Sequence, residues 1–240
     1  SVIFAPHPAA KNSSQETIKI LNDAIVSAGG PSALISTVNP PSVEFTQSLL
    51  KHPKVKMNIV TGGPAIVKIA MSAGKKTIAA GPGNPPCVVD ETADIEKAAA
   101  DMISGASFDN NVLCTAEKET LVVTEVFEQF LSALRKDKRA FELSTKQMDE
   151  LAKIVIKEPG GKCKEGVMNR DFVGRNASVI AKAIGLNISD DVRLLWGVVD
   201  KTHPFVVTEQ LMPVMPVVKM KNADEAIEFA VEVEGDNHHT

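Results

Sequence analysis

The sequence predicts an α/β protein built on parallel sheets. Short apolar runs alternate with helical patterns over residues 2–80, and the alternation resumes after Asn84. No internal repeat and no low-complexity linker interrupts the chain, so the boundary between its two parts is inferred from motifs. Because strand–helix–strand alternation places helices on the faces of a parallel sheet, we expect one sheet in residues 1–83 and a second α/β domain in residues 84–240.

The first helix of the first part is expected to begin near Ser14, which can cap it. Its apolar positions Ile18, Leu21 and Ile25 fall on one face, and Gly29-Gly30-Pro31 ends it. The other elements expected here are strands at residues 2–5, 34–38, 57–60 and 77–80 and helices at residues 42–51 and 64–73.

In the second part, Ser144 and Gln147 form a capping-box pattern that predicts a helix beginning at Ser144. Cys114 is expected on a loop between a helix and a strand. The other elements expected here are strands at residues 87–90, 121–124, 194–199 and 217–220 and helices at residues 92–104, 126–136, 176–184 and 224–231.

The composition excludes several classes of protein. With 44% apolar residues, 23% charged residues and a formal charge of −4, the chain lacks the basic balance of a nucleic-acid-binding protein. No apolar stretch reaches the roughly 18 residues of a membrane helix, and no signal-peptide pattern is present. The three cysteines, Cys87, Cys114 and Cys163, are odd in number and lack metal-type spacing. They therefore indicate a reducing, cytoplasmic compartment and no metal site.

A glycine-rich turn, Thr61-Gly62-Gly63-Pro64, leads from a predicted strand into a predicted helix. Glycine permits close backbone approach, proline suits the first helical turn, and the first amides of the helix lack partners. Parallel sheets bind ligands at the carboxyl ends of their strands, where this turn lies. The segment therefore suits a nucleotide phosphate, although the same residues also suit an ordinary turn between a strand and a helix.

Cys114 is the candidate nucleophile. The polar, amide-rich segment Ser107-Phe108-Asp109-Asn110-Asn111 precedes it, and an apolar run follows. Cys87, in an apolar run, and Cys163, in a loop rich in glycine and lysine, are expected to carry no chemistry. The thiolate is the reactive form of a cysteine. Asp109-Asn110-Asn111 is also compatible with a capped turn of no further function.

These motifs, in this order, resemble the aldehyde dehydrogenase superfamily. The matching segments are Thr61-Gly62-Gly63-Pro64, Ala79-Ala80-Gly81-Pro82-Gly83-Asn84-Pro85-Pro86, the approach to Cys114 and Thr208-Glu209-Gln210-Leu211. The phrase before the cysteine resembles the CoA-acylating branch of the ethanolamine- and propanediol-utilisation systems. The resemblance implies an incomplete parallel Rossmann-type, NAD-binding sheet in residues 1–83 and a catalytic α/β domain in residues 84–240. Because the family's chains extend beyond both ends, we expect an internal fragment.

The resemblance also implies roles for individual residues. Cys114 corresponds to the nucleophile that carries the acyl group as a thioester. His7 and Pro8 stand where many relatives carry a lysine that contacts the adenosine ribose, and Glu209 matches a glutamate that binds the nicotinamide ribose. The full set expected at the NAD site is His7, Pro8, Thr61, Gly62, Gly63, Gly81, Glu209 and Leu211. His7 is equally compatible with a structural role, and Glu209 with a solvated charge at a strand edge.

Ala80 marks a departure from the hydrolytic members of the superfamily. Those members carry a Glu-Leu-Gly-Gly segment whose glutamate activates water, where this chain has Ala80-Gly81-Pro82-Gly83. Water, with a pKa of about 15.7, needs a base or a metal, whereas a thiol titrates at about 8.5. The missing carboxylate therefore predicts transfer of the acyl group to a thiol, and the resemblance identifies that thiol as coenzyme A.

The resemblance thus implies a CoA-acylating aldehyde dehydrogenase that oxidises acetaldehyde or propionaldehyde with NAD. The alternatives are a hydrolytic aldehyde dehydrogenase, an acyl-phosphate reductase of the same superfamily, and an inactive nucleotide-binding or assembly fragment. The implied partners are a small aldehyde, further copies of the full-length chain in a dimer or tetramer, and a bacterial microcompartment shell. Neither nucleic acid nor membrane is expected. The expected location is the cytoplasm, including the interior of a microcompartment.

Overall fold

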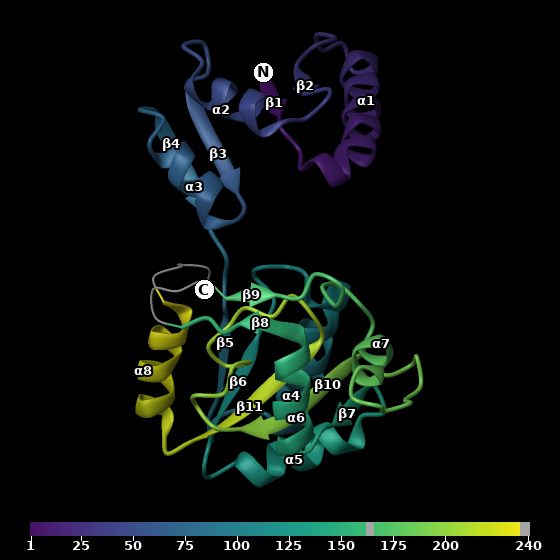
Figure 1. Ribbon diagram of the computed structural model, residues 1–240, viewed down its shortest axis with the longest axis vertical. Coiled ribbons are helices and arrows are strands. Elements are labelled where there is room, and N and C mark those ends of the chain that lie inside the picture. Colours follow the sequence, from purple (N-terminus) through teal and green to yellow (C-terminus); the bar gives the residue numbers. More distant parts are fainter. Residues whose placement is uncertain (162–165, 236–240) are drawn as a thin grey trace. The chain divides into compact units, whose positions relative to one another are not determined.

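The computed structural model describes residues 1–161 and 166–235, and it divides into two compact units, Ser1–Ala79 and Ala80–Thr240. This division lies four residues before the boundary inferred from the motifs. Both units contain parallel strand pairs joined by helices, so the predicted α/β class is confirmed (Figure 1).

The first unit holds two small sheets of two strands each. In one sheet β1 pairs in parallel with β2, and Val2 lies opposite Ile35. The other sheet joins β3 and β4. The elements are β1 (Val2–Phe4), the 3₁₀ turn η1 (Pro8–Ala10), α1 (Lys11–Ser27), β2 (Ile35–Thr37), α2 (Val43–Lys51), β3 (Met57–Thr61), α3 (Pro64–Met71) and β4 (Lys76–Ala80).

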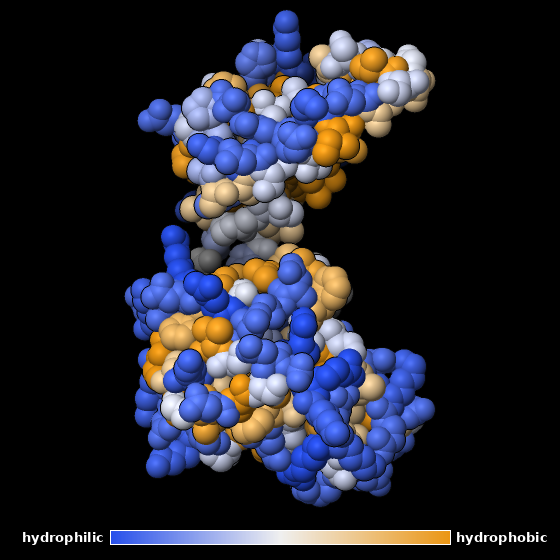
Figure 2. Space-filling model, turned by 90° about the vertical axis from the view of Figure 1, so that its right-hand side faces the viewer, coloured by the Kyte–Doolittle hydropathy of each residue, from blue (hydrophilic) through white to orange (hydrophobic). Residues whose placement is uncertain are grey.

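The first helix begins earlier than the sequence predicts, so Ser14 is not its cap. The turn η1 leads directly into α1, and Ala10 stands at the N-cap position without a side-chain bond. Of the three apolar positions on its predicted face, only Ile18 is buried, because the narrow sheet covers only part of the helix. Leu21 stays 42% exposed. Apolar side chains are also exposed on the strands of this unit, among them Ile59 and Ile78, and Figure 2 shows apolar surface on it.

The second unit is built on a five-stranded sheet in the order β5-β6-β11-β10-β7, and all neighbouring strands run parallel. Its elements are β5 (Pro86–Val89), α4 (Ile95–Ser107), the 3₁₀ turn η2 (Phe108–Asn111), β6 (Glu119–Val123), α5 (Phe127–Lys136), β7 (Ala140–Glu142), α6 (Thr145–Val155), β8 (Ile156–Glu158), β9 (Val167–Met168), α7 (Ala177–Lys182), β10 (Leu194–Val199), β11 (Val214–Met220) and α8 (Ala223–Glu234). The antiparallel pair of β8 and β9 lies outside the main sheet.

Helices cover both faces of this sheet, so the unit has three layers. Alternate side chains of a strand point to opposite faces. Leu194 and Trp196 of β10 accordingly pack with α4 and α5, whereas Leu195 and Val199 pack with α6, α7 and α8. Trp196, Leu194 and Leu195 are fully buried. This double-sided core holds the ends of the strands in place, including the loops that carry the candidate site.

Two helix starts in this unit illustrate how local sequence sets the boundaries. The predicted capping box of α6 is confirmed, with Ser144 accepting from the Gln147 amide and the Gln147 side chain reaching back to the Ser144 amide. Helix α4 begins at Ile95 rather than Thr92, because the Thr92 amide and hydroxyl both donate to the Asp90 carboxylate in a separate turn. Asp94 then caps the helix through the Lys97 amide.

Candidate active site

Cys114 lies on a loop between α4 and β6, here called the Cys114 loop (residues 108–118). Three successive residues of this loop, Asp109, Asn110 and Asn111, have φ angles of 48°, 52° and 58°. This left-handed conformation costs an ordinary L residue roughly 1–2 kcal/mol, but asparagine and aspartate adopt it more readily than other side chains. The amide-rich phrase that precedes the cysteine therefore meets a backbone requirement.

The side chains of the left-handed residues tie the loop to distant parts of the unit. The Asn110 amide donates to the Gly174 carbonyl at 3.0 Å and to the Asn176 side chain at 2.9 Å. The buried Asn111 amide donates to the carbonyls of Ala106 and Glu117, each at 2.8 Å. These contacts cross the loop and reach a segment more than 60 residues away. The loop is thus more than an isolated helix cap.

Lys118, which the sequence analysis did not single out, anchors the other side of the loop. Its side chain is fully buried, and Nζ donates to the backbone carbonyl of Asn111 at 2.9 Å, to the Asn111 side-chain oxygen, and to the Leu113 carbonyl at 2.9 Å. The three acceptors match the three hydrogens of an ammonium group. Burial lowers the pKa of Lys118 to about 8, opposed by electrostatic interactions with Glu209, Cys114, Glu119 and Glu117.

The two described thiols differ in their surroundings. Cys114 is half-buried in the turn that follows Leu113. Cys87 lies within β5, where burial, helped by the nearby charge of Glu117, raises the pKa of its thiol to about 11. A thiol with so high a pKa holds almost no thiolate near neutral pH. Cys163 lies outside the described residues.

Two further segments meet the Cys114 loop. The Lys118 amide donates to the Pro85 carbonyl at 3.0 Å, and the Lys118 carbonyl accepts from the Gln210 side chain at 3.0 Å. The Glu209 carboxylate accepts from the Gly83 amide at 3.3 Å. The structure therefore brings together three of the four segments that carry the sequence resemblance. They converge before β5, β6 and β11, at the amino ends of these strands and not at the carboxyl ends where parallel sheets commonly bind ligands.

Behind the loop lies a buried polar group centred on Glu119. Its carboxyl is fully buried and accepts from the Asn84 side chain at 3.3 Å, and Asn84 also donates to the Val206 carbonyl at 2.9 Å. Burial raises the pKa of Glu119 well above its ordinary range, with Glu234 adding to the shift and Lys118 opposing it. Sequence pattern does not predict this group, because lysine and glutamate side by side usually indicate an exposed turn.

The structure places the expected cofactor residues of the second unit as follows. Glu209 is part of the loop before β11, partly buried and bonded to the Gly83 amide. The Leu211 carbonyl accepts from the Gly174 amide at 2.9 Å, which ties this segment to the one that also holds Asn110. Gly81 follows β4, and a Cβ atom there would have no neighbour within 4 Å.

The expected cofactor residues of the first unit lie in two turns. The His7 side chain accepts from the Ala9 amide at 3.2 Å and caps η1, which Pro8 opens, so His7 has a local structural role. Thr61 ends β3, and Gly63 occupies the N-cap position of α3 without a side-chain cap bond. Between them Gly62 has a φ of 155°, which favours glycine. A helix start without a capping side chain fits a phosphate group.

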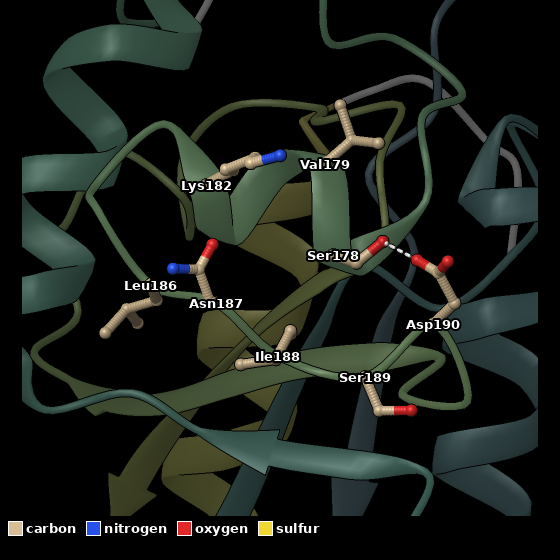
Figure 3. A pocket seen from close by; sticks show the side chains of 8 residues that line it. All are labelled: Ser178, Val179, Lys182, Leu186, Asn187, Ile188, Ser189 and Asp190. Carbon is tan, nitrogen blue, oxygen red and sulfur yellow. Dashed lines mark hydrogen bonds between the residues drawn. The ribbon is translucent and has the colours of Figure 1, made fainter.

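A surface hollow of about 460 Å³ lies apart from these segments in sequence, between α7 and the loop that follows it (Figure 3). The Ser178 hydroxyl bonds to the Asp190 carboxylate at 2.5 Å on its rim, so two of its polar groups satisfy each other. None of the residues predicted from the sequence lines it. Among the described residues, no group of three or more histidine, cysteine or acidic side chains is placed to hold a metal, and no helix is long and apolar enough to cross a membrane.

The Cys114 loop thus presents a half-buried thiol on a three-layer parallel α/β unit, close to a buried lysine. A sequence model of the aldehyde dehydrogenase family matches residues 1–155, and the chain belongs to that family. The predicted family and fold are thereby confirmed. The chain is 48% identical to an acetylating acetaldehyde dehydrogenase, EutE, of Salmonella typhimurium, and the match covers all of this chain and 51% of that protein.

Solved structures agree with this assignment. A propionaldehyde dehydrogenase from a fucose-utilisation microcompartment of Clostridium phytofermentans matches with a TM-score of 0.90 at 34% identity, covering 98% of this chain and 53% of that one. A propionaldehyde dehydrogenase of Rhodopseudomonas palustris, solved with bound CoA and an acylated cysteine, matches with a TM-score of 0.89 at 40% identity, covering 98% of this chain and 52% of that one. The chain thus spans about half the length of the relatives that it matches.

Proposed function

We propose that the full-length protein is a CoA-acylating aldehyde dehydrogenase that converts acetaldehyde or propionaldehyde to the corresponding acyl-CoA with NAD. The observation that carries this proposal is the Cys114 loop, which holds a half-buried thiol beside a buried ammonium group on a strained, heavily bonded turn. Of the relatives named above, one is an acetaldehyde dehydrogenase and two are propionaldehyde dehydrogenases. Both lines of support lead to the same chemistry.

Cys114 is the proposed nucleophile. Its thiolate attacks the aldehyde carbon, and the carbonyl oxygen becomes an oxyanion that needs hydrogen-bond donors. The backbone N–H of Cys114 is one such donor. The substrate carbon then gives up a hydride and is left as a thioester on Cys114. The thiol of CoA attacks that thioester, so the acyl–sulfur bond to Cys114 breaks as the bond to CoA forms and Cys114 returns as thiolate.

The choice of CoA over water follows from the carboxylates of the site. Ala80 offers no base where hydrolytic relatives carry a glutamate. Of the carboxylates described near the loop, Glu209 accepts from the Gly83 amide, and Glu119 is buried against Asn84. Glu117 packs so closely on α4 that a Cβ atom at Gly105 would collide with it. Without a glutamate at position 80, water reacts slowly, whereas a thiol supplies its own thiolate.

NAD, when bound, accepts the hydride from the substrate carbon. In the first unit, Thr61, Gly62 and Gly63 provide a strand-to-helix turn with open backbone for a phosphate, and His7 and Pro8 form the turn after β1. In the second unit, Glu209 and Leu211 are held in the loop before β11, and Gly81 lies in the segment after β4. These residues are our proposed cofactor contacts, with His7 the weakest because its ring nitrogen already caps η1.

The proposed setting follows from the relatives. One of them comes from a bacterial microcompartment, so we propose a cytoplasmic enzyme enclosed in such a compartment and assembled there as a dimer or tetramer. The exposed apolar side chains of the first unit, among them Ile59 and Ile78, are compatible with cover by further protein.

The experiment uses the full-length protein and follows NADH and acyl-CoA formation from acetaldehyde and propionaldehyde. We expect turnover with CoA, none with phosphate in its place, and complete loss in Cys114→Ala. Cys87→Ala is the matched control and should keep most of the activity, because the raised pKa of the Cys87 thiol keeps it protonated. Turnover with phosphate would support the acyl-phosphate reductase alternative. Substantial activity in Cys114→Ala would disprove the role of this cysteine.

A further inference from the structure

The Cys114 loop is held from inside by the side chain of Lys118, which bonds to Asn111 and Leu113. Lysine is almost never fully buried unless it is paired, because taking its charge out of water is costly. Lys118 is fully buried, and it immediately precedes β6. Its Nζ spans the loop from Asn111 to Leu113.

The two residues that accept hydrogen bonds from Lys118 connect the left-handed turn to Cys114. Asn111 is the last of the three left-handed residues, and Leu113 immediately precedes Cys114. The Leu113 carbonyl also accepts from the Ala116 amide at 3.2 Å, so it is held on both sides. The Lys118 ammonium group therefore links the left-handed turn to Leu113, the residue that orients Cys114.

The backbone of Lys118 is itself fixed by two hydrogen bonds. The Lys118 amide bonds to Pro85, its carbonyl accepts from Gln210, and Gln210 in turn donates to the Val214 carbonyl at 3.0 Å. The titratable groups that act on the Lys118 ammonium are the side chains of Glu209, Cys114, Glu119 and Glu117. An ammonium group next to a thiol favours the thiolate over the neutral form.

We propose that Lys118 is a positioning residue for Cys114, whose ammonium group holds the left-handed turn closed and places a positive charge beside the reactive thiol. This inference rests on the proposed function and deepens it. It assigns to one buried side chain both the orientation of Cys114 and the positive charge beside it. In this proposal Lys118 acts through Asn111 and Leu113 and not on the substrate.

The test measures alkylation of Cys114 by iodoacetamide in the full-length protein between pH 6 and 10, with the labelled peptide quantified by mass spectrometry. Lys118→Met keeps the length of the side chain but removes its hydrogens and charge, whereas Lys118→Arg keeps both. Lys146→Met is the matched control, because Lys146 is an exposed lysine of α6 with only a distant ion pair.

We expect Lys118→Met to move the midpoint of the pH profile upward, and each unit of that movement lowers the labelling rate at neutral pH about tenfold. Lys118→Arg should restore most of the rate, and Lys146→Met should match the wild type. A merely structural role would slow labelling without moving the midpoint. If Lys118→Met fails to fold, Lys118→Gln, which keeps amide donors without the charge, takes its place.

A folded Lys118→Met or Lys118→Gln protein with the wild-type rate and midpoint would overturn the inference. The alkylation assay needs neither NAD nor CoA, so its outcome is separate from that of the proposed function. Activity that survives in Cys114→Ala would end the catalytic role of the thiol, yet it would leave the effect of Lys118 on the thiol to be read from the pH profile.

Discussion

The contrast between the two described cysteines yields a quantitative prediction for thiol labelling. The perturbation is iodoacetamide at pH 8, applied to the folded full-length protein. The pKa of Cys87 is raised to about 11, so about one molecule in a thousand carries its thiolate at pH 8. A free cysteine with a pKa of about 8.5 would be about one-quarter ionised. The predicted rate for Cys87 is therefore about 200-fold below that of a free thiol, before any loss of access through burial.

The same pKa fixes how the rate should change with pH. Between pH 8 and pH 10 the thiolate fraction of Cys87 should rise close to a hundredfold, on the order of tenfold per unit, because both values lie below the pKa. The assay quenches labelling at timed intervals and quantifies each cysteine peptide by mass spectrometry. Protein unfolded in urea serves as the control, in which every cysteine should react alike. A folded-state rate for Cys87 that matches a free thiol, or that is flat between pH 8 and pH 10, would refute the reasoning.

Two substitutions test other parts of the account. Ala80→Glu in the full-length enzyme should raise hydrolysis of the acyl-enzyme relative to CoA transfer, since a correctly placed general base contributes about 10²–10⁴-fold; release of no free carboxylic acid, with acylation of Cys114 intact, would show that something other than the missing base selects the acceptor. Ser144→Ala removes both the cap and the capping box of α6 and should lower the free energy of unfolding by about 1 kcal/mol in urea titration. Lys146→Ala on the exposed face of the same helix should change it by less than about 0.5 kcal/mol, and equal effects of the two would contradict the capping argument.

Much of the fold follows from local pattern. Strand β10 occupies the six residues that the apolar run predicts, and the capping box of α6 forms at Ser144 and Gln147 as expected. The strands that escaped prediction are β7, β8 and β9, each of two or three residues. Segments so short cannot display a period, and they exist because a neighbouring strand offers its edge. The predicted start of α1 at Ser14 was wrong, because the turn that begins at Pro8 leads directly into the helix.

The candidate site was only partly predictable for a different reason. The segment before Cys114 is contiguous in sequence, so its amide-rich composition identified it. The left-handed backbone to which Asn110 and Asn111 are suited appears only in the structure. Lys118 and Glu119 gave no signal, since their burial depends on Asn84 and on the loop before β11, distant in sequence. Sequence reasoning therefore proposes a candidate nucleophile and misses the buried groups around it.

The central claim is that Cys114 carries the acyl group, and trapping the acyl-enzyme tests it most directly. The full-length protein is incubated with acetyl-CoA or propionyl-CoA without nicotinamide cofactor, quenched in acid and mapped by peptide mass spectrometry. The account predicts an acyl adduct confined to the peptide that contains Cys114, absent in Cys114→Ala and unchanged in Cys87→Ala. An adduct on another residue, or an acyl-enzyme that still forms in Cys114→Ala, would contradict it.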